Sequence, residues 1–237
     1  MLLSATIEHL AAASAEGVLL TLAAVVMLLC AFACLGSKLF DRYVYYYGLQ
    51  SVVLSFAAVV VAVHTHDIGL WVLAALTLLV KGIGIPYGTR HFLIERFALK
   101  RDVALSTGLS SSLIFGAFLT AFAFLVIRPN TVPDALVSQA TVPISTAVIL
   151  IGALCMVVRR HTIAQLIGWL LIENGVFLGA ITIVATFPFI VEAGVFLDLV
   201  AAVLIMIAFV SGLARQLAEA SAPELRQLTE LGRNGES

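Results

Sequence analysis

Long hydrophobic runs separated by short polar stretches make up most of the chain from Gly17 onward. A membrane-spanning helix needs about 20 mostly apolar residues, and about seven runs reach that length. The predicted transmembrane helices cover residues 17–37, 44–64, 68–86, 104–127, 138–158, 162–185 and 189–213. No stretch alternates with the two-residue period of a strand. We therefore predict an all-α fold, a polytopic membrane helix bundle.

The distribution of basic residues predicts the orientation of this bundle. Eleven of the 13 Lys and Arg residues fall in the connections after the first, third and fifth predicted helices and in the C-terminal tail. The other side holds only Arg128, and Lys81 lies inside a helix. Since cytoplasmic loops are rich in Lys and Arg, we predict an N-terminus outside and a cytoplasmic C-terminus. No Lys or Arg precedes the first run, which favours a retained anchor over a signal peptide.

Composition supports the membrane assignment and excludes several classes of function. Hydrophobic residues make up 62% of the chain and charged residues 11%, whereas a soluble domain has about 45–50% and about 25%. The formal net charge of −1 gives no basic field for nucleic acid. The three cysteines stand singly in apolar runs with no CxxC, so neither a zinc site nor an iron–sulfur cluster is predicted. No paired histidines suit haem, so we expect no cofactor, no metal and no catalytic centre in this chain.

Three charged residues lie inside the predicted helices, where ionisable groups are costly and commonly functional. At about 1.5 Å per residue, Glu173 lies roughly 15 Å and Asp198 roughly 14 Å into the bilayer, from opposite sides. Lys81 lies about 8 Å from the inner end of its helix, beside a Gly- and Pro-containing stretch (82–86) that fits a broken helix or a helix end. Membrane carboxylates serve as proton relays in pumps and transporters. We therefore predict a proton path through Glu173 and Asp198, with Lys81 as a modulator.

Structural roles compete with this interpretation. Lys81 could extend its amine to the inner surface. Glu173 and Asn174 could hydrogen-bond across a helix interface. The motif Gly175-x-x-x-Gly179 predicts close helix packing on a face nearly opposite Glu173.

The last three predicted helices resemble the smallest antiporter-like subunit of respiratory complex I. The resemblance rests on the basic run 159–161, on the segment 167–177 with its Glu-Asn-Gly, and on the helix around Asp198. That subunit carries one membrane acid in each of its second and third helices. Its first acid would fall at Leu170, and here the acid stands one turn later, on the same face, at Glu173.

The whole chain more closely resembles component E of hydrogenase-4 and formate hydrogenlyase complexes. This resemblance implies an N-terminal four-helix membrane extension (1–130), a three-helix module like the complex I small subunit (131–214) and a cytoplasmic tail (215–237). It also implies a non-catalytic membrane subunit of a group 4 nickel–iron hydrogenase or a complex I-like assembly. Metal and electron chemistry would belong to other subunits. The expected location is a bacterial or archaeal cytoplasmic (inner) membrane.

Two other functions compete with that of a proton-path subunit. A free-standing ion-coupled secondary transporter commonly has internal repeats and paired interrupted helices. We find no convincing repeat between the first three and the last three predicted helices. The other alternative is a purely structural subunit of a membrane arm, in which Glu173 and Asp198 would bond to each other or to neighbouring subunits.

Overall fold

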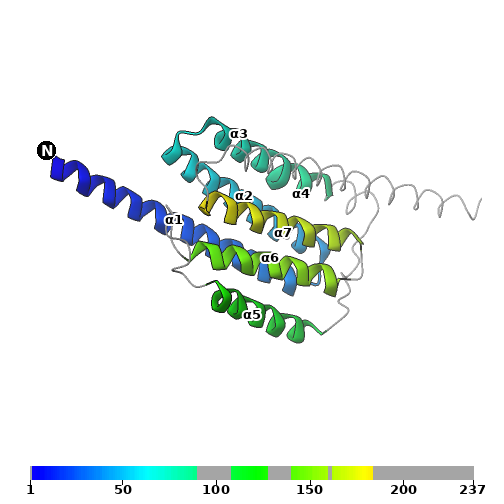
Figure 1. The fold of residues 1–237 in the computed structure, drawn as a ribbon. Coiled ribbons are helices and arrows are strands. Elements are labelled where there is room, and N and C mark those ends of the chain that lie inside the picture. Colours follow the sequence, from blue (N-terminus) through cyan, green and yellow to red (C-terminus); the bar gives the residue numbers. More distant parts are fainter. Residues whose placement is uncertain (1, 90–107, 128–139, 160–161, 184–237) are drawn as a thin grey trace, which may run out of the picture. The chain divides into compact units, whose positions relative to one another are not determined.

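Helices account for all the secondary-structure elements of the computed structural model, which describes residues 2–89, 108–127, 140–159 and 162–183 (Figure 1). The elements are α1 (Leu2–Gly36), α2 (Phe40–Thr65), α3 (Ile68–Leu76), a π-helical segment η1 (Thr77–Gly84), α4 (Ile85–Gly88), α5 (Leu109–Val126), α6 (Thr141–Val158) and α7 (Thr162–Ile183). All of them belong to one compact unit, Met1–Leu197. The all-α prediction is confirmed for these ranges.

Six helical segments in the described ranges are long and apolar enough to cross a membrane. They are Glu16–Gly36, Phe40–Thr65, Ile68–Gly88, Leu109–Val126, Thr141–Val158 and Ala164–Thr182. Each corresponds to one predicted span, and α3, η1 and α4 together form the third. The seventh predicted span, 189–213, lies outside the described residues, as do Asp198 and the tail.

The turn between α2 and α3 follows from its local sequence. His66, with φ of 55°, adopts the left-handed conformation that commonly ends a helix. Asp67 then caps α3, because its side chain accepts a 2.8 Å hydrogen bond from the Gly69 amide. These two residues terminate one apolar helix and start the next within a short polar connection.

Hydroxyl groups inside the helices donate back to their own backbone. Thr21, Thr65 and Thr120 each donate to the carbonyl four residues earlier, at 2.7–2.9 Å. In an apolar environment every polar group needs such a partner. These three hydroxyl groups are therefore compatible with membrane-spanning helices, because each donates to a backbone carbonyl.

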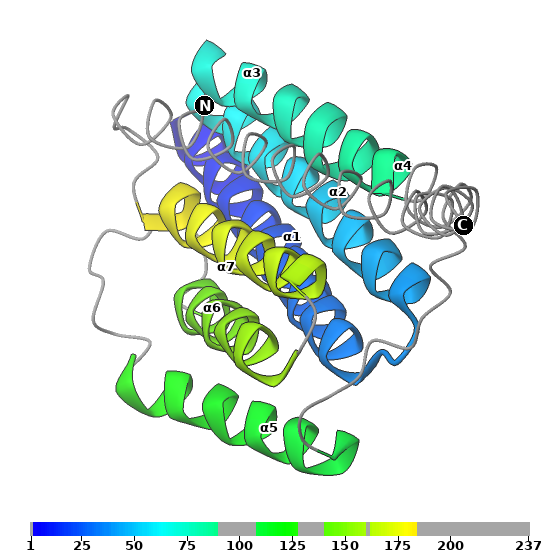
Figure 2. The same cartoon turned by 90° about the vertical axis from the view of Figure 1, so that its right-hand side faces the viewer.

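The helix α2 packs against α1, α3, η1 and α7, while α6 packs against α1, α5 and α7 (Figure 2). In the span of α7, 67% of the residues are buried, compared with 17% in α5. The polar side chains of α2, η1 and α7 are therefore candidates for an interior site, and α5 is peripheral.

Small residues bring α6 and α7 into close contact. A Cβ added to Gly168 would lie 3.1 Å from the carbonyl oxygen of Gly152, and one added to Gly175 would lie 3.1 Å from that of Ser145. At Gly179 the added atom would lie 2.9 Å from Ser145 Oγ. At Gly168 and Gly175 a larger side chain would press on the backbone of α6. At Gly179 it would press on the Ser145 side chain. Gly175 and Gly179 therefore lie on the face of α7 that packs against α6.

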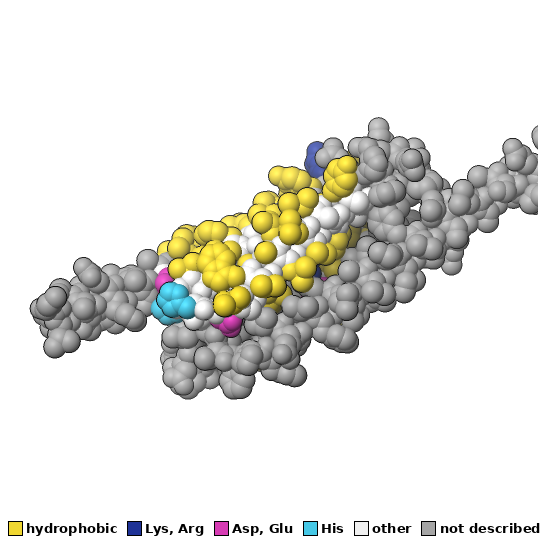
Figure 3. Space-filling model, turned by 90° about the horizontal axis from the view of Figure 1, so that it is seen from above, with side chains coloured by type: hydrophobic (Ala, Val, Ile, Leu, Met, Phe, Trp, Pro, Cys, Tyr) yellow, Lys and Arg dark blue, Asp and Glu magenta, His cyan; other side chains and the backbone are white. Residues whose placement is uncertain are grey.

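Hydrophobic side chains cover most of the described part of the face in Figure 3. On the α3–η1–α4 segment, the large apolar side chains of Ile68, Val72, Leu79 and Ile83 are between 54% and 78% exposed. A water-facing helix would expose polar residues instead. The outer surface therefore suits lipid or apolar partner surfaces.

Candidate functional site

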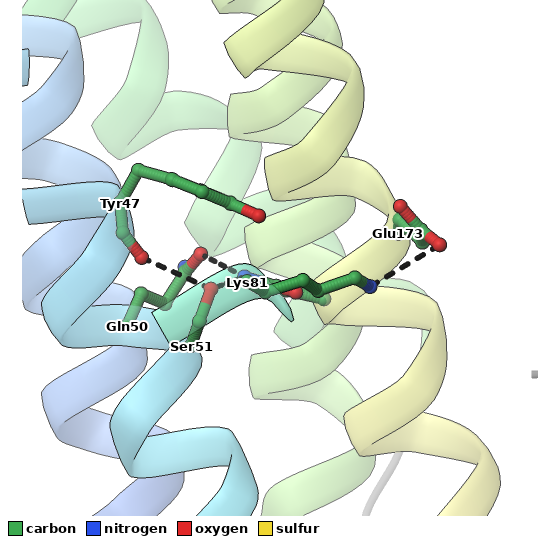
Figure 4. A network of polar contacts seen from close by, with 6 residues as sticks. Tyr47, Gln50, Ser51, Lys81 and Glu173 are labelled. Atoms are coloured by element: carbon green, nitrogen blue, oxygen red, sulfur yellow. Dashed lines mark hydrogen bonds and ion pairs between the residues drawn. The ribbon is translucent and has the colours of Figure 1, made fainter. Parts of the chain in front are cut away.

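A buried ion pair joins η1 to α7. Lys81 Nζ lies 3.1 Å from Glu173 Oε1, and the two side chains are only 3% and 6% exposed (Figure 4). Glu173 is near the middle of α7, about 16 Å from its first residue. Two opposite charges in contact inside an apolar bundle stabilise each other, since either charge alone would be very costly there.

Lys81 approaches Glu173 from a π-helical segment. The eight residues Thr77–Gly84 form η1 within an otherwise continuous helix from Ile68 to Gly88. π-helical turns are rare and occur frequently at functional sites. A broken helix or a helix end at 82–86 was expected, and the structure has instead a continuous helix whose winding changes around Lys81.

Small residues let this segment approach α2. A Cβ at Gly48 would lie 2.8 Å from Pro86 Cγ, and one at Gly82 would lie 3.2 Å from Val52 Cγ2. The lack of a side chain at Gly48 and Gly82 therefore allows α2 to pack closely against η1 and α4. The same approach places Lys81 in the interior, where its side chain is 3% exposed. Extension of its amine to the membrane surface is thus excluded in this conformation.

Asn174, which follows Glu173 in α7, belongs to a buried network of side-chain hydrogen bonds. The Asn174 amide donates to Gln50 Oε1 and to Ser51 Oγ, both at 3.1 Å. Gln50 in turn donates to the Met27 carbonyl at 3.0 Å. Ser51 donates to the Tyr47 carbonyl at 3.2 Å (Figure 4). Side-chain hydrogen bonds of this kind link helices in membranes. Asn174 therefore connects α7 to α2, and through Gln50 to α1.

The two adjacent polar residues of α7 thus have different partners. Glu173 contacts a cation, whereas Asn174 contacts neutral amide and hydroxyl groups. Cross-helix hydrogen bonding, weighed for both residues from the sequence, is observed for Asn174. An ion pair can bind or release a proton when its surroundings change, whereas an amide network cannot. Within the described residues, the Lys81–Glu173 pair is therefore the better candidate for charge or proton transfer.

Arg159 forms a second buried cationic site, which the sequence interpretation missed. Its Nη2 donates to the carbonyls of Cys34, Leu35 and Ser37 at 2.8–3.1 Å, at the C-terminal end of α1. Its guanidinium also lies 4.8 Å from the centre of the Tyr43 ring. A cation suits this position because the last carbonyls of a helix have no intrahelical partner and carry a partial negative charge. No sequence signal separates Arg159 from a loop cation, since it directly follows an apolar run.

No group of three or more His, Cys, Asp or Glu side chains in the described ranges could hold a metal ion. Cys30, Cys34 and Cys155 are free and buried, in keeping with small hydrophobic side chains.

The fold and the site together define a class of protein: a bundle of helices long and apolar enough to span a membrane, with a lysine–glutamate pair buried between them. Comparison with known proteins finds distant relatives of this chain. The chain is 28% identical over 168 residues to the uncharacterized protein Rv0085 of Mycobacterium tuberculosis, covering 71% of this chain and 76% of that protein.

Hydrogenase-4 component E proteins also match. The Escherichia coli K12 and Shigella flexneri proteins are each 28% identical to the chain over 94 residues, which is 40% of this chain and 44% of the relative. The matched region thus spans less than half of these relatives. No family model and no solved structure matches the chain. The comparisons support a distant relationship to hydrogenase-4 component E.

Proposed function

We propose that this protein is a membrane subunit of a multisubunit hydrogenase or complex I-like redox complex, and that it contributes to a proton (or cation) translocation path. The observation that carries the proposal is the buried contact between Lys81 and Glu173 in the middle of a helical bundle. The partial similarity to hydrogenase-4 component E supports membership in such a complex. The chain has no catalytic role in this proposal, and the redox chemistry belongs to other subunits.

The path itself is assigned to three residues. Glu173 accepts and releases the proton, Lys81 stabilises its ionised form, and Asp198 of the predicted seventh helix is the next acid. An opposite charge at 3.1 Å favours ionisation of a carboxylate, and movement of that charge away favours protonation. Exchange at Glu173 can therefore be controlled by the position of the Lys81 amine.

The proposal extends to the organisation of the chain. We assign residues 131–214 to a three-helix module and residues 1–130 to an extension that packs on it. The contacts of α6 with α1 and of α7 with α2 support an extension that buttresses the module. We also assign the C-terminal tail, 215–237, to the cytoplasm and the protein to the inner membrane, and the distribution of Lys and Arg supports this orientation.

Two measurements test the function. First, the native protein is purified from membranes and its co-purifying subunits are identified. We expect hydrogenase or quinone-oxidoreductase-like subunits, and isolation of the chain by itself would favour a free-standing transporter. Second, assembly and proton-coupled turnover of the complex are measured for Glu173→Gln beside Glu173→Ala. The Gln variant keeps the shape and removes the exchangeable charge, so we expect an assembled complex with impaired coupling.

A matched double variant makes the second measurement decisive. Glu173→Gln alone leaves the Lys81 ammonium buried without its carboxylate, which itself destabilises the bundle. Lys81→Met combined with Glu173→Gln removes both charges and restores the balance. If the double variant assembled and coupled normally, the ion pair would be purely structural and the proton path would be refuted. We expect an assembled complex that remains impaired.

A further inference from the structure

A pocket with two cations lies where α1 ends and α2 begins. It has a volume of about 560 Å³ and is lined by Lys38, Arg42, Ser37 and Tyr46 on its polar side, and by apolar residues including Ala33 and Leu109. These residues come from the end of α1, the start of α2 and the start of α5. None of the described residues that line the pocket is acidic.

Neither cation of the pocket forms an ion pair with another described residue, and the acidic residue between them in the sequence, Asp41, is exposed and does not line the pocket. The two ion pairs found in the described ranges are Lys81–Glu173 and His64–Glu16, and neither involves Lys38 or Arg42. Both cations line the pocket and are exposed. An anion at this position would therefore gain two charge-assisted contacts without displacing an existing partner.

The start of α2 adds to the attraction for an anion. The helix begins at Phe40, and its N-cap position is occupied by Leu39, whose side chain has no oxygen to accept from the first backbone amides. The N-terminus of a helix carries a partial positive charge and favours anions. Lys38, Arg42 and the first backbone amides of α2 thus outweigh the single acidic side chain of this turn, Asp41, which does not line the pocket.

The depth and the walls of the pocket indicate which anion it takes. The pocket lies at the ends of spanning segments, which is the level of lipid headgroups, and Ala33 and Leu109 lead from it along apolar helices. Basic pockets between helices on the cytoplasmic side bind the headgroups of anionic lipids. We propose that this pocket binds an anionic glycerophospholipid, with its phosphate held by Lys38 and Arg42 and an acyl chain lying against α1 and α5. This proposal does not depend on the Lys81–Glu173 path.

Native mass spectrometry of the full-length purified chain tests the site. The protein is delipidated in detergent and titrated with phosphatidylglycerol, phosphatidylcholine or inorganic phosphate. We expect one tightly held phosphatidylglycerol, much weaker binding of phosphatidylcholine and no displacement of the lipid by phosphate. Lys38 and Arg42 each strengthen the attraction to the anionic headgroup. The double variant Lys38→Gln with Arg42→Gln should therefore weaken phosphatidylglycerol binding roughly 30-fold.

Two further variants control for charge and for folding. Arg226→Gln with Arg233→Gln removes the same charge from the tail and should leave binding unchanged. Ala33→Phe retains both cations but fills the apolar part of the pocket, and it should also weaken lipid binding. Equal binding of phosphatidylcholine, displacement by inorganic phosphate, or an equal loss in the tail variant would each overturn the proposal.

Discussion

Replacement of Arg159 by alanine should destabilise the bundle more than removal of any exposed charge. Its Nη2 lies within 2.8–3.1 Å of three carbonyls at the end of α1, contributed by Cys34, Leu35 and Ser37. One NH₂ group has two hydrogens, so we count two charge-assisted hydrogen bonds at about 1.5–3 kcal/mol each. The contact with the Tyr43 ring adds about 1 kcal/mol. The expected loss for Arg159→Ala is therefore about 4–7 kcal/mol in the free energy of unfolding.

This loss corresponds to a large shift in melting temperature. At about 2–4 °C per kcal/mol for a chain of this size, Arg159→Ala should melt about 8–28 °C below the unmodified protein in detergent. Arg159→Lys retains the charge near the helix end but not the planar fork of donors, so it should lose about half as much. Differential scanning fluorimetry on the purified chain measures all three proteins.

Arg160→Ala is the charge-matched control, one residue further along the chain. If Arg159→Ala and Arg160→Ala lowered the melting temperature equally, the effect would be one of net charge and not of capping. If Arg159→Ala shifted it by less than about 2 °C, then capping of α1 by Arg159 would contribute almost nothing to stability. Either result would refute the reasoning.

Two further predictions concern helix packing and orientation. Gly175→Ala should lower the free energy of unfolding by about 1–3 kcal/mol, because the new Cβ would lie 3.0 Å from the Ile149 backbone nitrogen. Gly88→Ala is the control, since a Cβ there meets nothing within 4 Å. Equal thermal stability of the two variants would contradict close packing of α6 and α7. A single cysteine placed at Asn130 should react with an impermeant reagent in intact cells, whereas one at Arg160 should not. The native cysteines are buried and contribute little background. The reverse labelling pattern would show that the predicted orientation is wrong.

Hydrophobic pattern alone predicted much of the fold. The apolar runs marked six helices that the structure describes, because the length of a span is set by bilayer thickness. Helix α1 begins at Leu2, well before the first predicted span at residue 17, and the other helix ends are displaced by a few residues. Glu173 and Lys81 also stood out from the sequence, since a charge in an apolar run is rare enough to require an explanation. What the sequence could not supply was their contact. That contact depends on how η1 and α7 are rotated about their axes, and on the close approach of η1 to α2 at Gly48 and Gly82.

The role of Arg159 could not be predicted for a different reason. Counting Lys and Arg residues assigns a cation to one side of the membrane but says nothing about its side-chain partners. The carbonyls that accept from Arg159 lie more than 120 residues earlier in the chain, at the end of α1. Every residue has a backbone carbonyl, so the sequence does not mark which carbonyls will accept. A contact of this kind is visible only in the packed structure.

The last prediction separates the energy of the Lys81–Glu173 contact from the stability of the bundle around it. Lys81→Met and Glu173→Gln each leave one buried charge without its partner, which should cost about 3–5 kcal/mol in the free energy of unfolding. The double variant leaves no charge, only a buried amide, so its loss should be about 1–2 kcal/mol. The thermodynamic cycle would then give a coupling energy of several kcal/mol, far above the 0–1 kcal/mol typical of an exposed pair. Denaturant titration of the four proteins in one detergent provides the measurement. If the single losses simply added in the double variant, then Lys81 and Glu173 would not interact in the folded protein, and the proposed control of proton exchange by Lys81 would have no physical basis.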